Sequence, residues 1–325
     1  MLANIPSLRN AFAVMMSTLA LCISTVAGAG TVDRQSVTIW SQGVRLAGDI
    51  YTPSNIAEGE RLPGVLMIAG WGGNKNNVGR NYAEAVAAEG YVVLAFDFKG
   101  WGESDGAIVP TEALGHPDES VVMDISANHV RQIVDPFSMA ADVRAALFYL
   151  GGEATVMPNN LGVWGTSMGG GMALIPAATD SRVKAYVSQM GPINYAYNLS
   201  ALPAAGMQQI ETLTARGLLP PYPGPMSRQM NPALAGFPDW ASLKRFDLLS
   251  YMNQLAVPTL IIDAESETLF DTEQNGVLMY HAVKEKASAE YMTLPGGHYD
   301  MYHGDNLDAG RAAAIAWFNT HLKAD

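Results

Sequence analysis

Residues 159–177 read NNLGVWGTSMGGGMALIPA, and this stretch decides the expected fold. Residues 161–164 are an apolar run of strand length, and the small residues from 168 onward can begin a helix. A chain that turns abruptly from strand to helix takes its apex residue through strained backbone angles and needs small neighbours there. Gly165 and Gly169 are such neighbours, so the pattern predicts a G-x-S-x-G turn with Ser167 at its apex as a candidate nucleophile. The alternative is a structural turn with an idle serine.

The composition favours a globular chain with a large core. The 325 residues are enough for one large α/β domain or two small ones. The chain is 49% hydrophobic and 15% charged, which excludes a disordered chain. A net charge of −12, without a basic stripe, argues against a nucleic-acid partner. The single cysteine, Cys22, lies in the N-terminal segment, so the rest of the chain offers no disulfide and no thiolate ligand for a metal.

Residues 1–29 have the pattern of a secretory signal peptide. Arg9 supplies a positive start, residues 11–26 are mostly apolar, and Ala27-Gly28-Ala29 offers a small-residue cleavage site. The alternative is an uncleaved membrane anchor. The pattern predicts a secreted or periplasmic protein, cleaved near Ala29, with a mature domain over residues 30–325.

Strand and helix patterns alternate along most of the chain. A hairpin is expected over residues 37–51, with Gln42 and Gly43 at its turn. Further strands are expected at 65–68, 91–96, 161–164, 183–188, 258–262 and 291–294, and helices at 79–89, 136–150, 272–286 and 307–322. Near-continuous apolar strands alternating with helices are typical of a mostly parallel sheet with helices on both faces. Ligands bind such sheets beyond the carboxyl ends of the strands, where Ser167 is expected.

Residues 193–256 interrupt this alternation. They are rich in Leu, Met, Tyr and Pro, with a proline cluster over 220–225, and they are too long for an ordinary connection. We interpret them as a partly helical lid over the nucleophile. The alternative is a peripheral helical excursion without substrate contact.

Three motifs, taken together, resemble a known superfamily. They are the turn around Ser167, the stretch DFKGWGESDG over 97–106, and PGGHYDMY over 295–302. With them, residues 37–322 resemble the α/β-hydrolase superfamily of serine hydrolases, and are most similar to its dienelactone-hydrolase-like and X-prolyl-dipeptidyl-peptidase-like branches. The resemblance implies an α/β-hydrolase fold with a lid insertion, catalytic residues in the order serine, acid, histidine, and no metal or organic cofactor. It also implies an architectural role for residues 97–106, where Lys99 replaces the usual arginine.

His298 is the expected general base. Of the six histidines, it alone sits in a glycine turn directly after an apolar strand, where this order requires a base. His303 is the fallback.

The acid is less sharply defined, because four carboxylates follow the strand over 258–262. In the superfamily the acid commonly lies about five positions after the last strand residue, and Glu267 occupies that slot after Ile262. A glutamate departs from the commoner aspartate but is accepted in such triads. The other candidates are Asp263, Glu265 and Asp271.

The resemblance also implies two backbone N–H donors for an oxyanion. Met168, directly after the nucleophile, supplies one, and Trp71, in the loop after the 65–68 strand, supplies the other. The usual His-Gly of that loop is Ala69-Gly70 here.

These residues favour an exported serine hydrolase that cleaves a carboxylic ester through an acyl-enzyme. The Met- and Tyr-rich lid favours a small-molecule ester or acyl substrate of apolar or aromatic character. The alternatives are peptide cleavage or acyl transfer by the same triad, and a non-catalytic binding protein on a hydrolase scaffold.

Overall fold

A computed structural model describes residues 30–219 and 235–323. The predicted signal peptide over 1–29 and the proline cluster over 220–225 therefore lie outside the described residues. No helix in these two ranges is long and apolar enough to cross a membrane.

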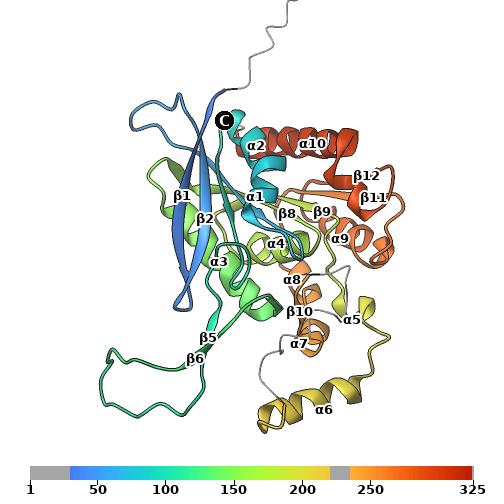
Figure 1. The fold of residues 1–325 in the computed structure, drawn as a ribbon. Helices are drawn as coiled ribbons and strands as arrows, with labels where there is room; N and C mark the ends of the chain where they lie inside the picture. Colours follow the sequence, from blue (N-terminus) through green and yellow to red (C-terminus); the bar gives the residue numbers. More distant parts are fainter. Residues whose placement is uncertain (1–29, 220–234, 324–325) are drawn as a thin grey trace, which may run out of the picture.

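A single large sheet runs through the middle of the molecule (Figure 1). Its strand order is β1-β2-β4-β3-β8-β9-β11-β12. The strands are β1 (Val32–Ser41), β2 (Val44–Pro53), β3 (Leu62–Ile68), β4 (Val92–Phe96), β8 (Val156–Thr166), β9 (Val183–Gln189), β11 (Thr259–Ala264) and β12 (Ala289–Leu294). β1 and β2 pair antiparallel, as does β2 with β4, and the pairs from β4 to β12 are parallel. The expected hairpin and the mostly parallel sheet are confirmed.

Helices cover both faces, as predicted. One face is packed by α3 (Pro136–Gly152), α4 (Met168–Thr179) and α9 (Gly276–Val283), the other by α2 (Glu84–Ala88) and α10 (Gly304–Leu322). Successive residues of β3 alternate between the two cores, since Leu66 and Ile68 join the first and Val65 and Met67 the second. Burial on both faces is why the central strands read as continuous apolar runs.

Two helix predictions were wrong at their boundaries. The helix expected over 79–89 begins earlier, as α1 (Lys75–Val78), because Asn74 caps it by accepting a hydrogen bond from the Asn77 N–H at 3.0 Å. A π-helical turn, η1 (Gly79–Ala83), then leads into α2. The helix expected over 272–286 is a 3₁₀ turn, η3 (Thr272–Gln274), followed by α9, and the two are separated at Asn275. The Asn275 side chain accepts hydrogen bonds from the N–H groups of residues 193 and 194, which fixes this break.

The insertion over 193–256 is partly helical in its described parts. It contains α5 (Tyr195–Asn198), α6 (Ala204–Ala215), β10 (Phe237–Pro238), α7 (Trp240–Arg245) and α8 (Leu249–Met252). β10 pairs with the short strand β7 (Ile133–Val134), just before α3. Two further strands, β5 (Ala107–Pro110) and β6 (Ala127–Val130), form a separate hairpin that the sequence pattern does not indicate.

Candidate active site

Ser167 lies at the apex of a strained turn between β8 and α4. Its φ of 51° and ψ of −128° are unusual for a residue with a side chain. A Cβ on Gly165 would lie 2.0 Å from the Gly169 carbonyl oxygen, and a Cβ on Gly169 would lie 2.3 Å from the Ile68 carbonyl oxygen. Both positions therefore require glycine, and the predicted G-x-S-x-G turn is formed as expected.

His298 approaches Ser167 from the end of a different strand. It begins the 3₁₀ turn η4 (His298–Tyr302), which follows β12, and it is only 3% exposed. Its Nε2 lies 3.0 Å from the Ser167 Oγ, within hydrogen-bonding distance. The carboxyl ends of parallel strands meet at one edge of the sheet, which brings together two residues that are 131 positions apart. The fallback His303 is exposed, at the N-cap of α10.

Glu267 completes the arrangement from the loop after β11. Its Oε2 lies 2.7 Å from the His298 Nδ1, and both side chains are 2% exposed. Its Oε1 accepts hydrogen bonds from the backbone N–H groups of residues 268 and 269, at 2.9 and 2.8 Å. Donors on both oxygens compensate for the loss of water around a buried carboxylate. The structure thus brings Ser167, His298 and Glu267 into one relay.

The other three acid candidates lie elsewhere. Glu265 is exposed. Asp271 is also exposed and caps η3, accepting hydrogen bonds from the Glu273 N–H at 3.0 Å and the Tyr197 hydroxyl at 3.2 Å. Asp263 is fully buried at the end of β11 and makes no contact with His298 in the structure.

Asp263 is nevertheless the most perturbed carboxyl group near the site. Burial raises its pKa to about 7; the neighbouring Tyr291 hydroxyl opposes this rise, and the charge of Glu267 adds to it. A Cβ on Gly276 would lie 1.9 Å from the Asp263 Oδ2, so the first residue of α9 closes over the carboxyl group. Asp263 is therefore held in a tight, buried space.

Replacing Asp263 with asparagine is expected to stabilise the protein at alkaline pH. An unfolded aspartate has a pKa of about 3.9, whereas the folded value is about 7. Between these values the folded state keeps a proton that the unfolded state releases, so the free energy of unfolding falls as the pH rises, by up to about 1.4 kcal/mol per pH unit. The Asp263→Asn protein has no titrating group at this position and does not lose stability in this way. Urea unfolding of the wild type and the variant at pH 4.5 and pH 8 measures the effect. A stability difference between the two proteins that is the same at both pH values would contradict the prediction.

The loop after β3 lies directly against the serine. A Cβ on Gly70 would lie 2.9 Å from the Ser167 Cβ, so only glycine permits this approach. Trp71 follows, and Met168 begins α4 beside Ser167. Among the described residues, no acceptor is assigned to the backbone N–H of either Trp71 or Met168.

The side chain of Trp71 connects this loop to the insertion. Its indole N–H donates a hydrogen bond of 2.7 Å to the Ala235 carbonyl, and its ring lies 6.0 Å from that of Trp240 at the start of α7. The returning part of the insertion therefore packs beside the predicted oxyanion loop.

Residues 42–218 match the family model of the X-Pro dipeptidyl-peptidase (S15) family, a span that holds the Ser167 turn and the Trp71 loop. The match covers more than half of the chain. The chain belongs to the S15 family. It thereby belongs to the α/β-hydrolase superfamily. Glu267 and His298 lie beyond the matched span.

Individual proteins and solved structures are also similar to this chain. The quorum-quenching protein AidA of Acinetobacter baumannii is 30% identical over 178 residues, which are 55% of this chain and 49% of AidA. The chain thus matches about half the length of AidA. An uncharacterised 31.7 kDa protein of Escherichia coli is 23% identical over 86% of this chain and 98% of its own. The crystal structure of the α/β hydrolase GrgF from Penicillium superposes with a TM-score of 0.67 at 18% identity, covering 90% of this chain and 100% of GrgF.

The aromatic rings around His298 were not predicted from the sequence. Phe270 and Tyr299 lie 6.0 and 5.3 Å from the His298 ring, and Tyr302 lies 6.3 Å away. Burial raises the pKa of Tyr302 to about 12, against the opposing effect of the Thr166 and Ser167 hydroxyls beside it. Tyr299 and Tyr302 belong to the GGHYDMY turn over 296–302. Their closeness to His298 in the sequence is the feature from which their position in the site could have been predicted.

A buried charged cluster next to the loop after β3 was not predicted from the sequence. Lys75 is 2% exposed, and its Nζ lies 2.8 Å from Asp49 and 3.0 Å from Glu103. Asp97 accepts hydrogen bonds from the backbone N–H groups of Lys75 and Glu103, at 2.7 and 2.8 Å. These bonds join the 70–75 segment to the 97–106 loop, which bears out the architectural role expected of that loop.

Proposed function

We propose that this protein is a serine hydrolase that cleaves a carboxylic ester of a small molecule through an acyl-enzyme. The observation that carries the proposal is the relay in which His298 lies 3.0 Å from the Ser167 Oγ and 2.7 Å from the Glu267 carboxylate. A serine hydroxyl is a weak nucleophile at neutral pH and needs a base held in place by a third group. The three side chains have the spacing that this requires.

The first half of the reaction forms the acyl-enzyme. The Ser167 Oγ attacks the ester carbonyl carbon as its proton passes to the His298 Nε2, and Glu267 stabilises the resulting imidazolium. The backbone N–H groups of Met168 and Trp71 bind the oxyanion. His298 then returns the proton to the departing alcohol, and the C–O bond to that alcohol breaks.

The second half hydrolyses the acyl-enzyme. A water molecule gives its proton to the His298 Nε2 and attacks the same carbonyl carbon. The tetrahedral intermediate collapses, the proton returns to the Ser167 Oγ, and a carboxylic acid leaves.

Aromatic rings near the relay support an apolar or aromatic substrate. Phe270 and Tyr299 lie beside the His298 ring, and Trp71, in the loop that packs against Ser167, lies against Trp240 of the insertion. Such rings supply apolar contact area and can stack on a planar group. The insertion over 193–256 would then serve as a lid, and the signal pattern over 1–29 supports an exported protein.

A second candidate is peptide cleavage, which the description of the S15 family favours. Both activities would use the same relay, so a substrate panel has to separate them. An amide carbonyl is more strongly stabilised by resonance than an ester carbonyl, and the amide nitrogen must be protonated before it can leave. We therefore expect ester turnover to exceed that of a matched X-Pro amide.

The proposal is tested by labelling with a fluorophosphonate and measuring intact mass. We expect one adduct on the wild type and none on Ser167→Ala, and no labelling of a folded His298→Ala, because the serine needs its base. An ester, amide and acyl-transfer panel on the wild type then identifies the reaction. A folded wild type that takes no adduct would favour a non-catalytic binding protein, and labelling that survives Ser167→Ala would identify a different nucleophile.

A further inference from the structure

An arm projects from the body of the protein between β5 and β6 (Figure 1). Every residue from 111 to 127 is exposed. Beyond the 3.0 Å hydrogen bond from the Thr111 N–H to the Ser126 carbonyl, residues 112–125 have no hydrogen bond assigned to another described residue. Connections of this length without secondary structure are uncommon in compact domains and are often functional. The arm is therefore a candidate for binding another molecule.

The arm carries apolar side chains that a monomer would leave in water. Its five large apolar residues are 41–104% exposed: Leu114, Val121, Val122, Met123 and Ile125. Apolar side chains gathered on one exposed segment mark an interaction surface. The arm also carries four carboxylates, none of which has an ion pair in the described parts of the chain: Glu112, Asp118, Glu119 and Asp124. Its surface is thus both apolar and acidic.

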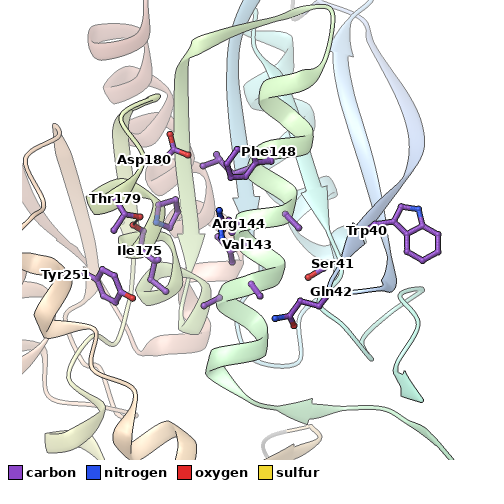
Figure 2. Close-up of a pocket in the computed structure, with 15 residues that line it drawn as sticks. Trp40, Ser41, Gln42, Val143, Arg144, Phe148, Ile175, Thr179, Asp180 and Tyr251 are labelled. Carbon is purple, nitrogen blue, oxygen red and sulfur yellow. Dashed lines mark hydrogen bonds between the residues drawn. The ribbon is translucent and has the colours of Figure 1, made fainter. Parts of the chain in front are cut away.

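A groove of complementary character lies along α3 (Figure 2). It encloses about 900 Å³ between α3 and α4, with the turn of the β1–β2 hairpin at one end. Its walls include Val143, Leu147 and Ile175, and two aromatic rings stand at its border. These are Trp40, which is 66% exposed, and Phe148, which is 52% exposed. Large rings left this open are suited to receive apolar side chains from outside.

The groove also offers a positive charge. The guanidinium groups of Arg144 and Arg182 lie 5.4 and 4.4 Å from the centre of the Phe148 ring. Arg182 is paired with Asp180 at 2.7 Å, whereas Arg144 has no carboxylate within 4.0 Å in the described ranges. An unpaired cation beside an apolar surface complements an arm that carries unpaired carboxylates.

The two features flank the same helix. The base of the arm and the first turns of α3 line a small cavity together, which includes Val109, Val130 and Met139. The groove follows α3 further along, over residues 140–148. Seven residues along one side of the arm, when extended, reach about 23 Å from its base, at about 3.3 Å per residue. An arm and a groove on one side of a molecule can exchange reciprocally about a two-fold axis, which closes the assembly at two copies.

We propose that two copies of this chain form a two-fold dimer in which the arm of each copy, residues 111–127, lies in the α3–α4 groove of the other. The apolar residues of the arm cover Trp40 and Phe148, and an arm carboxylate pairs with Arg144. The acidic arm makes an anionic lipid surface the poorer partner. This dimer does not depend on the proposed reaction, because neither feature includes a residue of the relay.

Sedimentation velocity of the purified protein tests the dimer. We expect a dimer at concentrations of about 1 to 100 µM. Val122→Asp in the arm and Trp40→Glu in the groove are each expected to raise the dimer dissociation constant by about tenfold or more, because each places a charge in the contact. Ile210→Asp is the matched control, since Ile210 is 47% exposed on α6, outside both features. Thermal unfolding midpoints close to that of the wild type would show that the variants are folded.

Mixing the two variants gives a sharper test. Val122→Asp keeps an intact groove and Trp40→Glu keeps an intact arm, so the mixture can form one of the two contacts. We expect heterodimers in the mixture under conditions where each variant alone is monomeric. A wild type that stays monomeric at about 100 µM would overturn the proposal. So would a dimer that the arm substitution leaves intact, or an arm-dependent flotation of the monomer with phosphatidylcholine vesicles.

Discussion

Ser167→Ala is expected to lower kcat/KM for the best ester of the panel by a factor on the order of 10⁶. The substitution removes the atom that forms the acyl-enzyme and leaves the rest of the relay in place. The residual rate should exceed that of the uncatalysed reaction, because the N–H groups of Trp71 and Met168 can still polarise a bound carbonyl. Initial rates with a chromogenic ester measure the effect.

A serine remote from the site provides the control for this experiment. Ser181 is exposed in the connection between α4 and β9, where its carbonyl oxygen accepts a hydrogen bond from the Lys184 Nζ. Ser181→Ala should retain the wild-type rate. A Ser167→Ala protein within tenfold of the wild type would show that Ser167 is not the nucleophile.

The parts of the site that could be predicted from the sequence have local causes. The Ser167 turn is encoded by glycines whose neighbours leave no room for a Cβ, and such spacing is visible in the chain itself. His298 could be chosen among six histidines because it alone follows a strand within a glycine turn. The parallel sheet then brings the two residues together, since its strands end at a common edge.

The choice of acid depends on contacts that the sequence does not show. The N–H of residue 265 donates a hydrogen bond to the Leu294 carbonyl, and that of residue 266 donates to the Gly296 carbonyl, both at 2.9 Å. These bonds align the turn after β11 with the turn that holds His298, and Glu267 consequently points at the imidazole. Asp263, only four positions earlier, lies inside the sheet layer against Gly276. Spacing along the chain cannot distinguish these two environments.

Other features escaped prediction because they depend on distant partners. Lys75 reads as a surface residue, and only the fold reveals its burial beside Asp49, which comes from β2. The requirement for glycine at position 79, where the π-helical turn begins, also depends on β2, because a Cβ there would lie 2.1 Å from the Tyr51 hydroxyl. The hairpin of β5 and β6 packs little of its apolar content into the core, so hydrophobic patterning gives no indication of it.

Glu267→Gln is expected to lower kcat by a factor on the order of 10³–10⁴, with the fold retained. The amide has nearly the shape of the carboxylate and can still accept hydrogen bonds from the N–H groups of residues 268 and 269. It carries no charge to stabilise the imidazolium, and its NH₂ group can hold His298 in the wrong tautomer. The kcat of Glu267→Asp should lie between those of Glu267→Gln and the wild type. The shorter aspartate side chain keeps the charge but draws the carboxylate back from the 2.7 Å contact with the His298 Nδ1.

Asp263→Asn is the matched comparison, since it also replaces a buried carboxyl group near the carboxyl end of β11. At pH 8 we expect its kcat to stay within about tenfold of the wild type, because Asp263 does not touch the imidazole and acts on the site only through its charge. Pre-steady-state acylation rates of Asp263→Asn and Glu267→Gln, measured at the same pH, show which substitution slows the reaction more. Were Asp263→Asn the slower enzyme and Glu267→Gln close to the wild type, Asp263 would be the triad acid. The turn that joins the ends of β11 and β12 would then have to rearrange when substrate binds.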